Sequence, residues 1–197
     1  MKVYQELGGN GTDDSVVLLS SVKHQEGGVV NLNSHVYDKF ALGEKLTLAH
    51  IEFGNVNHNI DGRPIKIGEM VMFTRNDYKK DIRNGSVGKV LGFNDEDVTI
   101  DFEGNIVELD LNDLVNIERA YAMTVHKSQG SQYERVIVVV KNSRNLDRHL
   151  LYTAVTRAKQ QVIFVGCRDT FHSALEKSNA LNRNTLLATH LMRCNFK

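Results

Sequence analysis

A strand–helix–strand pattern in the last third of the chain limits the fold more than any other feature. Two apolar runs, residues 135–140 and 162–165, have the length and the Val/Ile content of buried strands. Residues 150–159 between them have the pattern of an amphipathic helix, which would carry Arg157 and Lys159. Strand, helix and strand in this order indicate a parallel α/β sheet. Such sheets bind ligands at polar residues near the ends of their strands.

A second α/β unit is predicted nearer the N-terminus. Residues 15–21 form a short apolar run that is typical of a buried strand. Asn31 or Asn33 can cap the helix that follows, and Gly43 can end it. The apolar residues of this helix recur at i, i+4 and i+8: Leu32, Val36 and Phe40. Residues 1–14 are polar and rich in glycine, and they predict a loosely held lead-in.

The periodicity changes between residues 65 and 117. Four short runs of strand type are separated by turn signals such as Asn84-Gly85: residues 69–74, 86–93, 97–102 and 105–109. This pattern predicts a small antiparallel β-barrel inserted into an α/β domain. The predicted domains are therefore a discontinuous α/β domain of residues 1–64 and 118–197 and a barrel of residues 65–117. Closing helices are predicted at residues 169–177 and 184–192. Residues 46–53 are a candidate strand, although the pattern of residues 46–63 does not decide their structure.

The charges are balanced overall but segregated along the chain. The 197 residues contain 24 Lys and Arg and 24 Asp and Glu. Residues 95–118 contain nine acidic residues and no Lys or Arg, whereas residues 75–89 contain five basic and two acidic residues, and residues 141–159 contain five and one. A polyanion is therefore expected on the two basic segments.

The cysteines and the hydropathy of the chain predict its surroundings. Cys167 and Cys194 lack the spacing of metal ligands, and no metal site is predicted. Neither a signal peptide nor a membrane span is expected, because the first residues lack the signal pattern and no apolar run approaches the ~20 residues of a span. A reduced, cytoplasmic protein without a membrane anchor is expected.

No complete site for a nucleoside triphosphate is predicted. The glycine-rich segment 8–12 has no Lys, and segment 85–89 has neither the spacing nor the strand-to-helix position of a P-loop. No Asp-Glu pair ends a buried strand. This chain by itself is therefore expected not to hydrolyse ATP.

Two ordered motifs resemble those of a known family. Thr-Val-His-Lys-Ser-Gln-Gly-Ser at residues 124–131 resembles motif V of superfamily 1 helicases, and Leu-Leu-Tyr-Thr-Ala-Val-Thr-Arg-Ala-Lys at residues 150–159 resembles motif VI. The resemblance is to the RecD-like branch, the exonuclease V alpha-subunit family. Residues 73–78 and 84–88 are similar to that family's entry into a barrel of the Src-homology-3 type, and residues 17–40 to the start of its second RecA-like domain. The resemblance covers most of the chain and implies a P-loop NTPase fold that lacks Walker A and B.

The resemblance implies the C-terminal half of an ATP-dependent DNA helicase that moves 5′ to 3′ with ATP and Mg²⁺. Its implied partners are single-stranded DNA and the N-terminal RecA-like domain, which would hold most of the nucleotide and the Mg²⁺. The sequence does not identify nuclease or recombination subunits. The alternatives are a stand-alone nucleic-acid-binding module and a protein-interaction module, each with the helicase fold but without the motor. Arg157 argues against both, because it has no purpose in a protein that never meets a γ-phosphate.

The resemblance assigns the catalytic and nucleotide-binding residues. Arg157 is the implied arginine finger, because a planar, permanently charged guanidinium can stabilise charge on the γ-phosphate. The alternative is an unpaired arginine on an exposed helix face. Gly130 and Gln132 are implied nucleotide contacts. Many family members carry Glu in place of Gln132, where it meets the ribose, and Gln keeps the hydrogen bond but loses the charge.

The resemblance and the charge pattern assign the nucleic-acid contacts. The implied contacts to single-stranded DNA are Thr124, His126 and Lys127. They are expected at a strand-to-helix turn, where free backbone N–H groups suit phosphate. The alternative is a capping threonine and a solvated histidine. Near the first hairpin of the barrel, the candidates for contacts to the DNA backbone are Lys79, Lys80 and Arg83, although a solvated loop explains them equally well.

Overall fold

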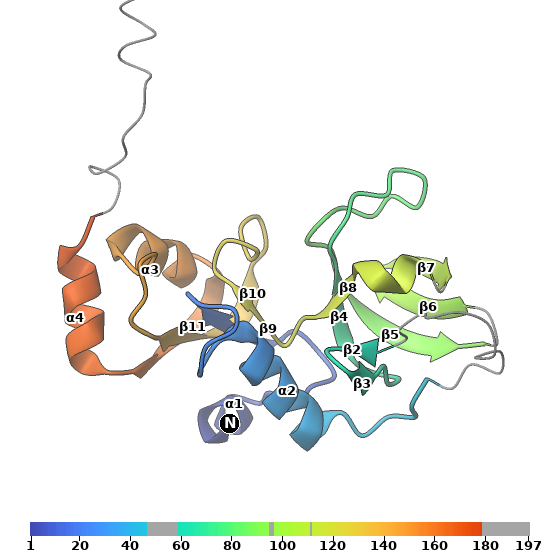
Figure 1. The fold of residues 1–197 in the computed structure, drawn as a ribbon, viewed down its shortest axis with the longest axis horizontal. Coiled ribbons are helices and arrows are strands. Elements are labelled where there is room, and N and C mark those ends of the chain that lie inside the picture. The colour runs from blue at the N-terminus through green and yellow to red at the C-terminus, as the bar shows by residue number, and fades with distance from the viewer. Residues whose placement is uncertain (47–58, 95–96, 111, 179–197) are drawn as a thin grey trace, which may run out of the picture.

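The computed structural model describes residues 1–46, 59–94, 97–110 and 112–178, which form two lobes (Figure 1). One lobe is built on a four-stranded parallel sheet and the other on a five-stranded antiparallel sheet. The elements are α1 (Lys2–Glu6), β1 (Val16–Ser20), α2 (Val29–Phe40), β2 (Asn59–Ile60), β3 (Arg63–Pro64), β4 (Met70–Phe73), β5 (Val87–Phe93), β6 (Asp97–Phe102), β7 (Asn105–Asp110), the 3₁₀ helix η1 (Asp113–Asn116), β8 (Ile117–Arg119), β9 (Ala122–Thr124), β10 (Tyr133–Val140), α3 (Arg148–Val155), β11 (Ala158–Gly166) and α4 (Arg168–Glu176). The predicted fold class, an α/β domain with an inserted antiparallel β-unit, is confirmed.

The sheet of the first lobe is parallel throughout, in the order β11-β10-β1-β9. All five residues of the inner strand β1 are buried, which explains its continuous apolar sequence. β11 lies at the edge of the described sheet, and Val162, Ile163 and Phe164 are only half-buried. The prediction of a fully buried strand there was wrong, because an edge strand has a neighbour on one side only. Helices α2 and α3 pack on the sheet, and α4 packs against α3.

Helix α2 begins earlier than predicted, with Gly28 at its N-cap. Asn33 is not a cap but a buried residue inside the helix. Its amide donates hydrogen bonds to the carbonyls of Arg119 (3.1 Å) and Ala122 (2.9 Å) and accepts one from the Ala122 N–H (2.8 Å). Asn33 thus satisfies backbone groups at the start of β9, where a buried polar group must find a partner. Gly43 lies beyond the helix end, where a Cβ would come within 1.9 Å of the Ile67 carbonyl oxygen.

The N-terminal residues are more ordered than predicted. Residues 2–6 form α1, and Tyr4 is buried in the core of the first lobe. The Tyr4 hydroxyl accepts a hydrogen bond from the Gly11 N–H, and burial raises the pKa of Tyr4 to about 12. The prediction of a loosely held lead-in was therefore wrong, because one buried aromatic residue is enough to hold the segment against the core.

The second lobe is an antiparallel sheet in the order β7-β6-β5-β4-β8. Buried and half-buried residues alternate along β6, as expected of a sheet with one face on a core. The core contains Val71, Phe73, Ile100 and Leu109, with their neighbours from the other strands. β8 crosses the predicted domain boundary at residues 117 and 118, and the boundaries remain a prediction.

A buried ion pair lies where the two lobes join. The Arg119 guanidinium donates to the Glu69 carboxylate over 2.9 Å, and both side chains are at most 1% exposed. Arg119 also donates to three backbone carbonyls, those of Ile60, Arg63 and Pro64. Its guanidinium stacks over the Tyr37 ring of α2 at 4.2 Å. One side chain therefore ties the inserted sheet, the β2–β3 hairpin and α2 together.

The remaining predicted elements are partly outside the described residues. Helix α4 agrees with the predicted helix over residues 169–177. The predicted helix over residues 184–192 and nearly all of the predicted strand over residues 46–53 lie outside the described residues. In the part of the chain that the structure describes, no helix is long and apolar enough to cross a membrane.

Candidate nucleotide and nucleic-acid interface

Four of the predicted site residues lie in the segment between β9 and β10: His126, Lys127, Gly130 and Gln132. The Thr124 hydroxyl accepts a hydrogen bond from the Lys127 N–H (3.3 Å), and the Thr124 carbonyl accepts one from the Ser128 N–H (3.2 Å). The buried Ser128 hydroxyl donates to the Val125 carbonyl (2.8 Å). These bonds close a compact turn that leads into β10. The strand-to-helix turn predicted at Thr124, His126 and Lys127 is therefore a connection between two strands. We call residues 125–132 the crossing loop, because it runs from the carboxyl end of β9 to the amino end of β10.

The three residues predicted to contact nucleotide line one cavity. Gly130, Gln132 and Arg157 border a space of about 450 Å³, together with Lys159 and Asp14. Asp14, Gln132 and Arg157 each precede a strand (β1, β10 and β11), so the cavity lies at the amino ends of the parallel strands. The sequence pattern had favoured the opposite end, where open α/β sheets usually bind ligands. The arrangement differs because the crossing loop carries Gln132 back across the sheet.

Arg157 is held in place by three hydrogen bonds. Helix α3 ends at Val155, so Arg157 lies in the turn before β11, and the prediction that the helix carries it was wrong. Its Nε donates to the Thr153 carbonyl (3.2 Å), one terminal nitrogen to the Ser131 carbonyl (3.1 Å) and the other to the Thr156 hydroxyl (3.1 Å). A guanidinium has five N–H donors, so two remain for a ligand. The half-buried side chain is therefore positioned before any ligand enters.

Charges of both signs surround this cavity. Glu103, from the β6–β7 turn of the inserted sheet, lines it opposite Arg157 and Lys159. Tyr133 also lines it, and the buried Tyr133 hydroxyl donates to the Met123 sulfur (3.3 Å). The pKa of Tyr133 is raised to about 12, chiefly by burial; the charges of Asp14 and Glu103 contribute to the rise, and a hydrogen bond with Ser131 and the charge of Arg157 oppose it. The two carboxylates and the guanidinium thus act on the same small region.

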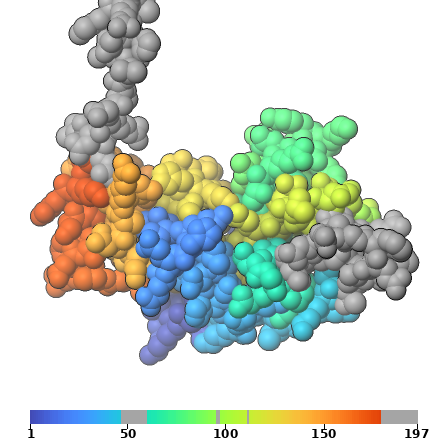
Figure 2. Space-filling view, viewed as in Figure 1, coloured from blue at the N-terminus to red at the C-terminus, as the bar shows by residue number. Residues whose placement is uncertain are grey.

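A second, larger cavity lies between the lobes. It measures about 640 Å³ and is lined by Arg83 and Lys127, which were both predicted to contact DNA. It shares four lining residues with the first cavity: Val87, Glu103, Gly130 and Ser131. The two cavities are therefore adjoining parts of one groove between the crossing loop and the inserted sheet. Figure 2 shows the notch where the yellow crossing loop faces the green 74–86 loop.

The other predicted DNA contacts lie away from this groove. Lys80 donates to the Asp113 carboxylate (2.6 Å) and to the Glu108 carbonyl (3.0 Å), so an acidic segment already neutralises it. Lys79 is exposed and lines neither cavity. The charges are segregated along the sequence, but the fold pairs Lys80 of the basic segment with Asp113 of the acidic one.

His126 borders a third cavity of about 310 Å³, beside His149 and the N-terminus of α3. It is exposed, and its cavity meets the large groove only at Gln129. Within the described ranges, no group of three or more His, Cys, Asp or Glu is placed to hold a metal ion. The structure thus separates His126 from Arg157 and from the charged groove.

Two charged residues that the sequence did not single out lie beside the crossing loop. The Lys127 ammonium contacts one oxygen of the Glu118 carboxylate (2.7 Å), and the Lys23 ammonium contacts the other (3.1 Å). Glu118 belongs to β8, and Lys23 follows β1. These residues are far apart in the sequence, and no local pattern predicts that they meet.

The parallel sheet with its inserted antiparallel sheet defines a class of fold: a RecA-like domain of the superfamily 1 helicase type. The family model described as the UvrD-like helicase C-terminal domain matches residues 119–165, which include the crossing loop and Arg157. In fold, the chain is similar to the Pif1 helicase from Bacteroides in complex with ADP-AlF3 and single-stranded DNA. That likeness has a TM-score of 0.56 at 16% identity and covers 93% of this chain and 46% of the other.

The sequence relatives are more specific. The chain is 34% identical over 186 residues to the ATP-dependent RecD2 DNA helicase of Deinococcus radiodurans, which covers 93% of this chain and 24% of that protein. It is 38% identical over 113 residues to the RecBCD enzyme subunit RecD of Mycolicibacterium smegmatis, which covers 56% of this chain and 20% of that protein. The chain thus spans between a fifth and a quarter of the length of these relatives. It is a homologue of RecD-like helicases over most of its length, which confirms the resemblance seen in the motifs.

Proposed function

We propose that this chain is the C-terminal motor domain of an ATP-dependent DNA helicase, in which Arg157 acts on the nucleotide and the crossing loop contacts the strand. The observation that carries the proposal is that Gly130, Gln132 and Arg157 border one cavity, although 25 residues separate the last two in the sequence. A domain that only bound nucleic acid would not need an arginine fixed at a second, separate end of the groove.

The residues of the smaller cavity fit the phosphate end of a nucleotide. Arg157 offers two N–H donors in a fixed orientation, and Lys159 adds a second positive charge. ATP would supply the phosphoryl bond that is broken, and Arg157 would stabilise the charge that develops on the γ-phosphate. Gln132, a neutral donor and acceptor, can bind a ribose hydroxyl.

The larger cavity suits a nucleic-acid backbone. Lys127 and Arg83 face it from opposite lobes, and backbone contacts of this kind hold a strand without reading its sequence. The Thr124 hydroxyl accepts the Lys127 N–H, so its contribution is to shape the loop that presents Lys127. His126 would contact the strand from the neighbouring cavity. The Bacteroides Pif1 helicase, which shares the fold, binds both ADP-AlF3 and single-stranded DNA.

The other parts of the motor would come from a first RecA-like domain. That domain would supply the P-loop and the Mg²⁺ ligands, and closing over ATP would shift the grip of this domain on the strand. One relative is by name a subunit of the RecBCD enzyme, which supports the proposal that such a motor assembles with further subunits. A second candidate function is a nucleic-acid-binding module without a motor. Of the two cavities, only the larger one favours it.

Substitution of Arg157 separates the two functions in a motor that joins this chain to its first RecA-like domain. Arg157→Lys keeps a positive charge but loses the planar fork, and it should lower ATP turnover by about 10³-fold or more while DNA affinity stays within a few-fold. Arg168→Ala, an exposed arginine outside both cavities, is the matched control. Unchanged turnover in both Arg157→Lys and Arg157→Ala would refute the action of Arg157 on the nucleotide, and an equal loss of turnover and DNA affinity would make Arg157 a strand contact.

A further inference from the structure

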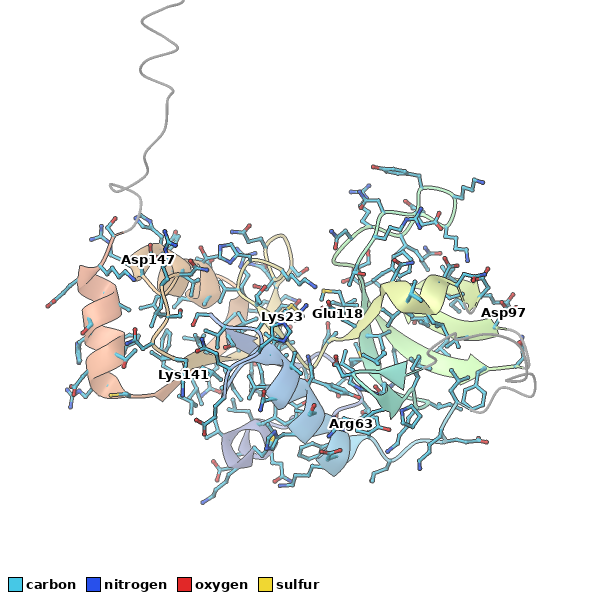
Figure 3. All side chains as sticks on the ribbon, in the orientation of Figure 1. Lys23, Arg63, Asp97, Glu118, Lys141 and Asp147 are labelled. Carbon is cyan, nitrogen blue, oxygen red and sulfur yellow. The ribbon has the colours of Figure 1, made fainter. Side chains whose placement is uncertain are left out.

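Two lysines grip one carboxylate at the junction of the lobes. Lys23 and Lys127 each contact a different oxygen of Glu118, at 3.1 and 2.7 Å. The three side chains come from three segments: the loop after β1, the crossing loop and β8 of the inserted sheet. Figure 3 shows Lys23 and Glu118 next to each other between the lobes. We call this group the lysine clamp.

The lysine clamp carries a net positive charge that a ligand can reach. Two ammonium groups face one carboxylate, and the side chains of Lys23, Glu118 and Lys127 are 45%, 36% and 34% exposed. Burial alone would raise the pKa of Glu118, but the hydrogen bonds and charges of Lys127 and Lys23 outweigh it and lower that pKa. Glu118 therefore remains an anion, and ion pairs this exposed contribute little to stability.

We propose that Lys23 and Lys127 together bind one backbone phosphate of single-stranded DNA, and that the Glu118 carboxylate holds this place when no strand is bound. This inference rests on the proposed function. A carboxylate and a phosphodiester both present two anionic acceptor oxygens, so a pair of ammonium groups that fits one also fits the other. Lys127 also lines the large cavity, so a strand in the groove passes beside the clamp.

Displacement of Glu118 has a structural consequence. The carboxylate joins β8 of the inserted sheet to the crossing loop, and a phosphate that takes its place removes that link. Lys23 then becomes a strand contact, which the sequence analysis missed. Glu118 becomes a competitor that weakens strand binding.

The test is strand affinity against salt concentration, measured by fluorescence anisotropy with a labelled oligothymidylate and the full chain. Lys23→Ala should weaken binding several-fold at low salt and flatten the slope of log affinity against log salt by about 0.7, the value for one contact to a single strand. Glu118→Gln removes the competing charge at constant size, so it should tighten binding several-fold and steepen the slope by up to about 0.7. In the double variant Glu118→Gln/Lys23→Ala, much of the tightening should be lost.

A matched control removes the effect of net charge. Glu108→Gln makes the same charge change on the exposed edge strand β7, and it should leave affinity within about twofold. Tightening by Glu108→Gln as large as that by Glu118→Gln, or weaker binding in Glu118→Gln, would overturn the competitor role.

Lys127→Ala separates this inference from the proposed function. If Lys127→Ala weakens binding but Lys23→Ala and Glu118→Gln do not change it, the clamp is only an internal ion pair and this inference fails alone. If none of the three substitutions changes affinity, the strand does not bind at the crossing loop, and the strand-binding part of the proposed function fails as well.

Discussion

The buried pair of Arg119 and Glu69 should make the junction of the lobes the most sensitive point for stability. Arg119→Met keeps the aliphatic length but leaves the Glu69 carboxylate buried without its charged partner, and it frees the carbonyls of Ile60, Arg63 and Pro64. Removing one partner of a buried ion pair typically costs about 3–5 kcal/mol. Because both side chains are at most 1% exposed, no solvent screening reduces this value. For a chain of this size, about 4 kcal/mol corresponds to a fall in Tm of roughly 8–16 °C.

The two partners should not be equivalent. Glu69→Gln keeps an oxygen that can accept from Arg119, and the guanidinium keeps its three carbonyls and the Tyr37 ring, so we expect a loss of about 2 kcal/mol. The chain contains no Trp, so urea unfolding is best followed by circular dichroism. Lys159→Met, which breaks an exposed pair with Glu134, is the control and should cost at most about 1 kcal/mol.

The pH dependence gives a second signature of the same pair. Burial raises the pKa of Glu69 above its ordinary 4.5, and Arg119 opposes that rise. An acid whose folded-state pKa is raised loses stabilisation as the pH increases from its unfolded value through its folded value. In Arg119→Met the pKa should rise further, so this variant should be less stable at pH 8 than at pH 5. A loss below about 1 kcal/mol in Arg119→Met, or no such pH dependence, would refute this account of the junction.

Three further predictions concern charges and catalysis. Arg83→Ala should flatten the salt dependence of strand binding, because Arg83 lines the large cavity, whereas Lys80→Ala should not, because Asp113 already neutralises Lys80; equal slopes would contradict this. Glu118→Gln should flatten the acid limb of the stability curve. A carboxyl with a lowered pKa stabilises the fold above its ordinary 4.5 and loses that effect as pH falls through the folded pKa. An equal fall of the urea midpoint from pH 5 to pH 3 in the variant and in the unsubstituted protein would contradict it. The chain alone should release no phosphate from ATP and Mg²⁺; release that a point substitution in this chain abolishes would contradict that.

The regular elements could be predicted from sequence because their signals are local. The alternating pattern of β6 and the continuous apolar runs of β1 and β10 report directly which faces each strand buries. The motifs around Thr124 and Arg157 predicted which residues share a site, since their order along the chain resembles that of a known family. The Gly130–Gln132–Arg157 cavity agrees with that grouping, and the roles of these residues remain predictions.

The wrong predictions concern residues whose partners come from distant segments of the sequence. Asparagine is common at helix N-caps, yet Asn33 lies inside α2, where it binds backbone groups near residues 119–122. Tyr4 sits in a polar segment, yet the core buries it. Lys80 pairs with Asp113, beside the inserted sheet, and Lys23 pairs with Glu118 of β8. The local sequence therefore could not show that the charges of these two lysines are paired.

Under the proposed function, one short segment, the crossing loop, serves two ligands. At one end, Lys127 is held by Glu118 of the inserted sheet. At the other, the Ser131 carbonyl accepts a hydrogen bond from Arg157, so the guanidinium and the loop backbone are joined directly. Under the proposed function, a shift of Arg157 toward a γ-phosphate pulls on Ser131, and four residues further back the same loop presents Lys127 to the strand. The Ser131 N–H donates to the Ser128 carbonyl (3.2 Å), and the buried Ser128 hydroxyl donates to the Val125 carbonyl, so both ends of the loop are tied to Ser128. Through these bonds the proposed function would link nucleotide state to the grip on the strand.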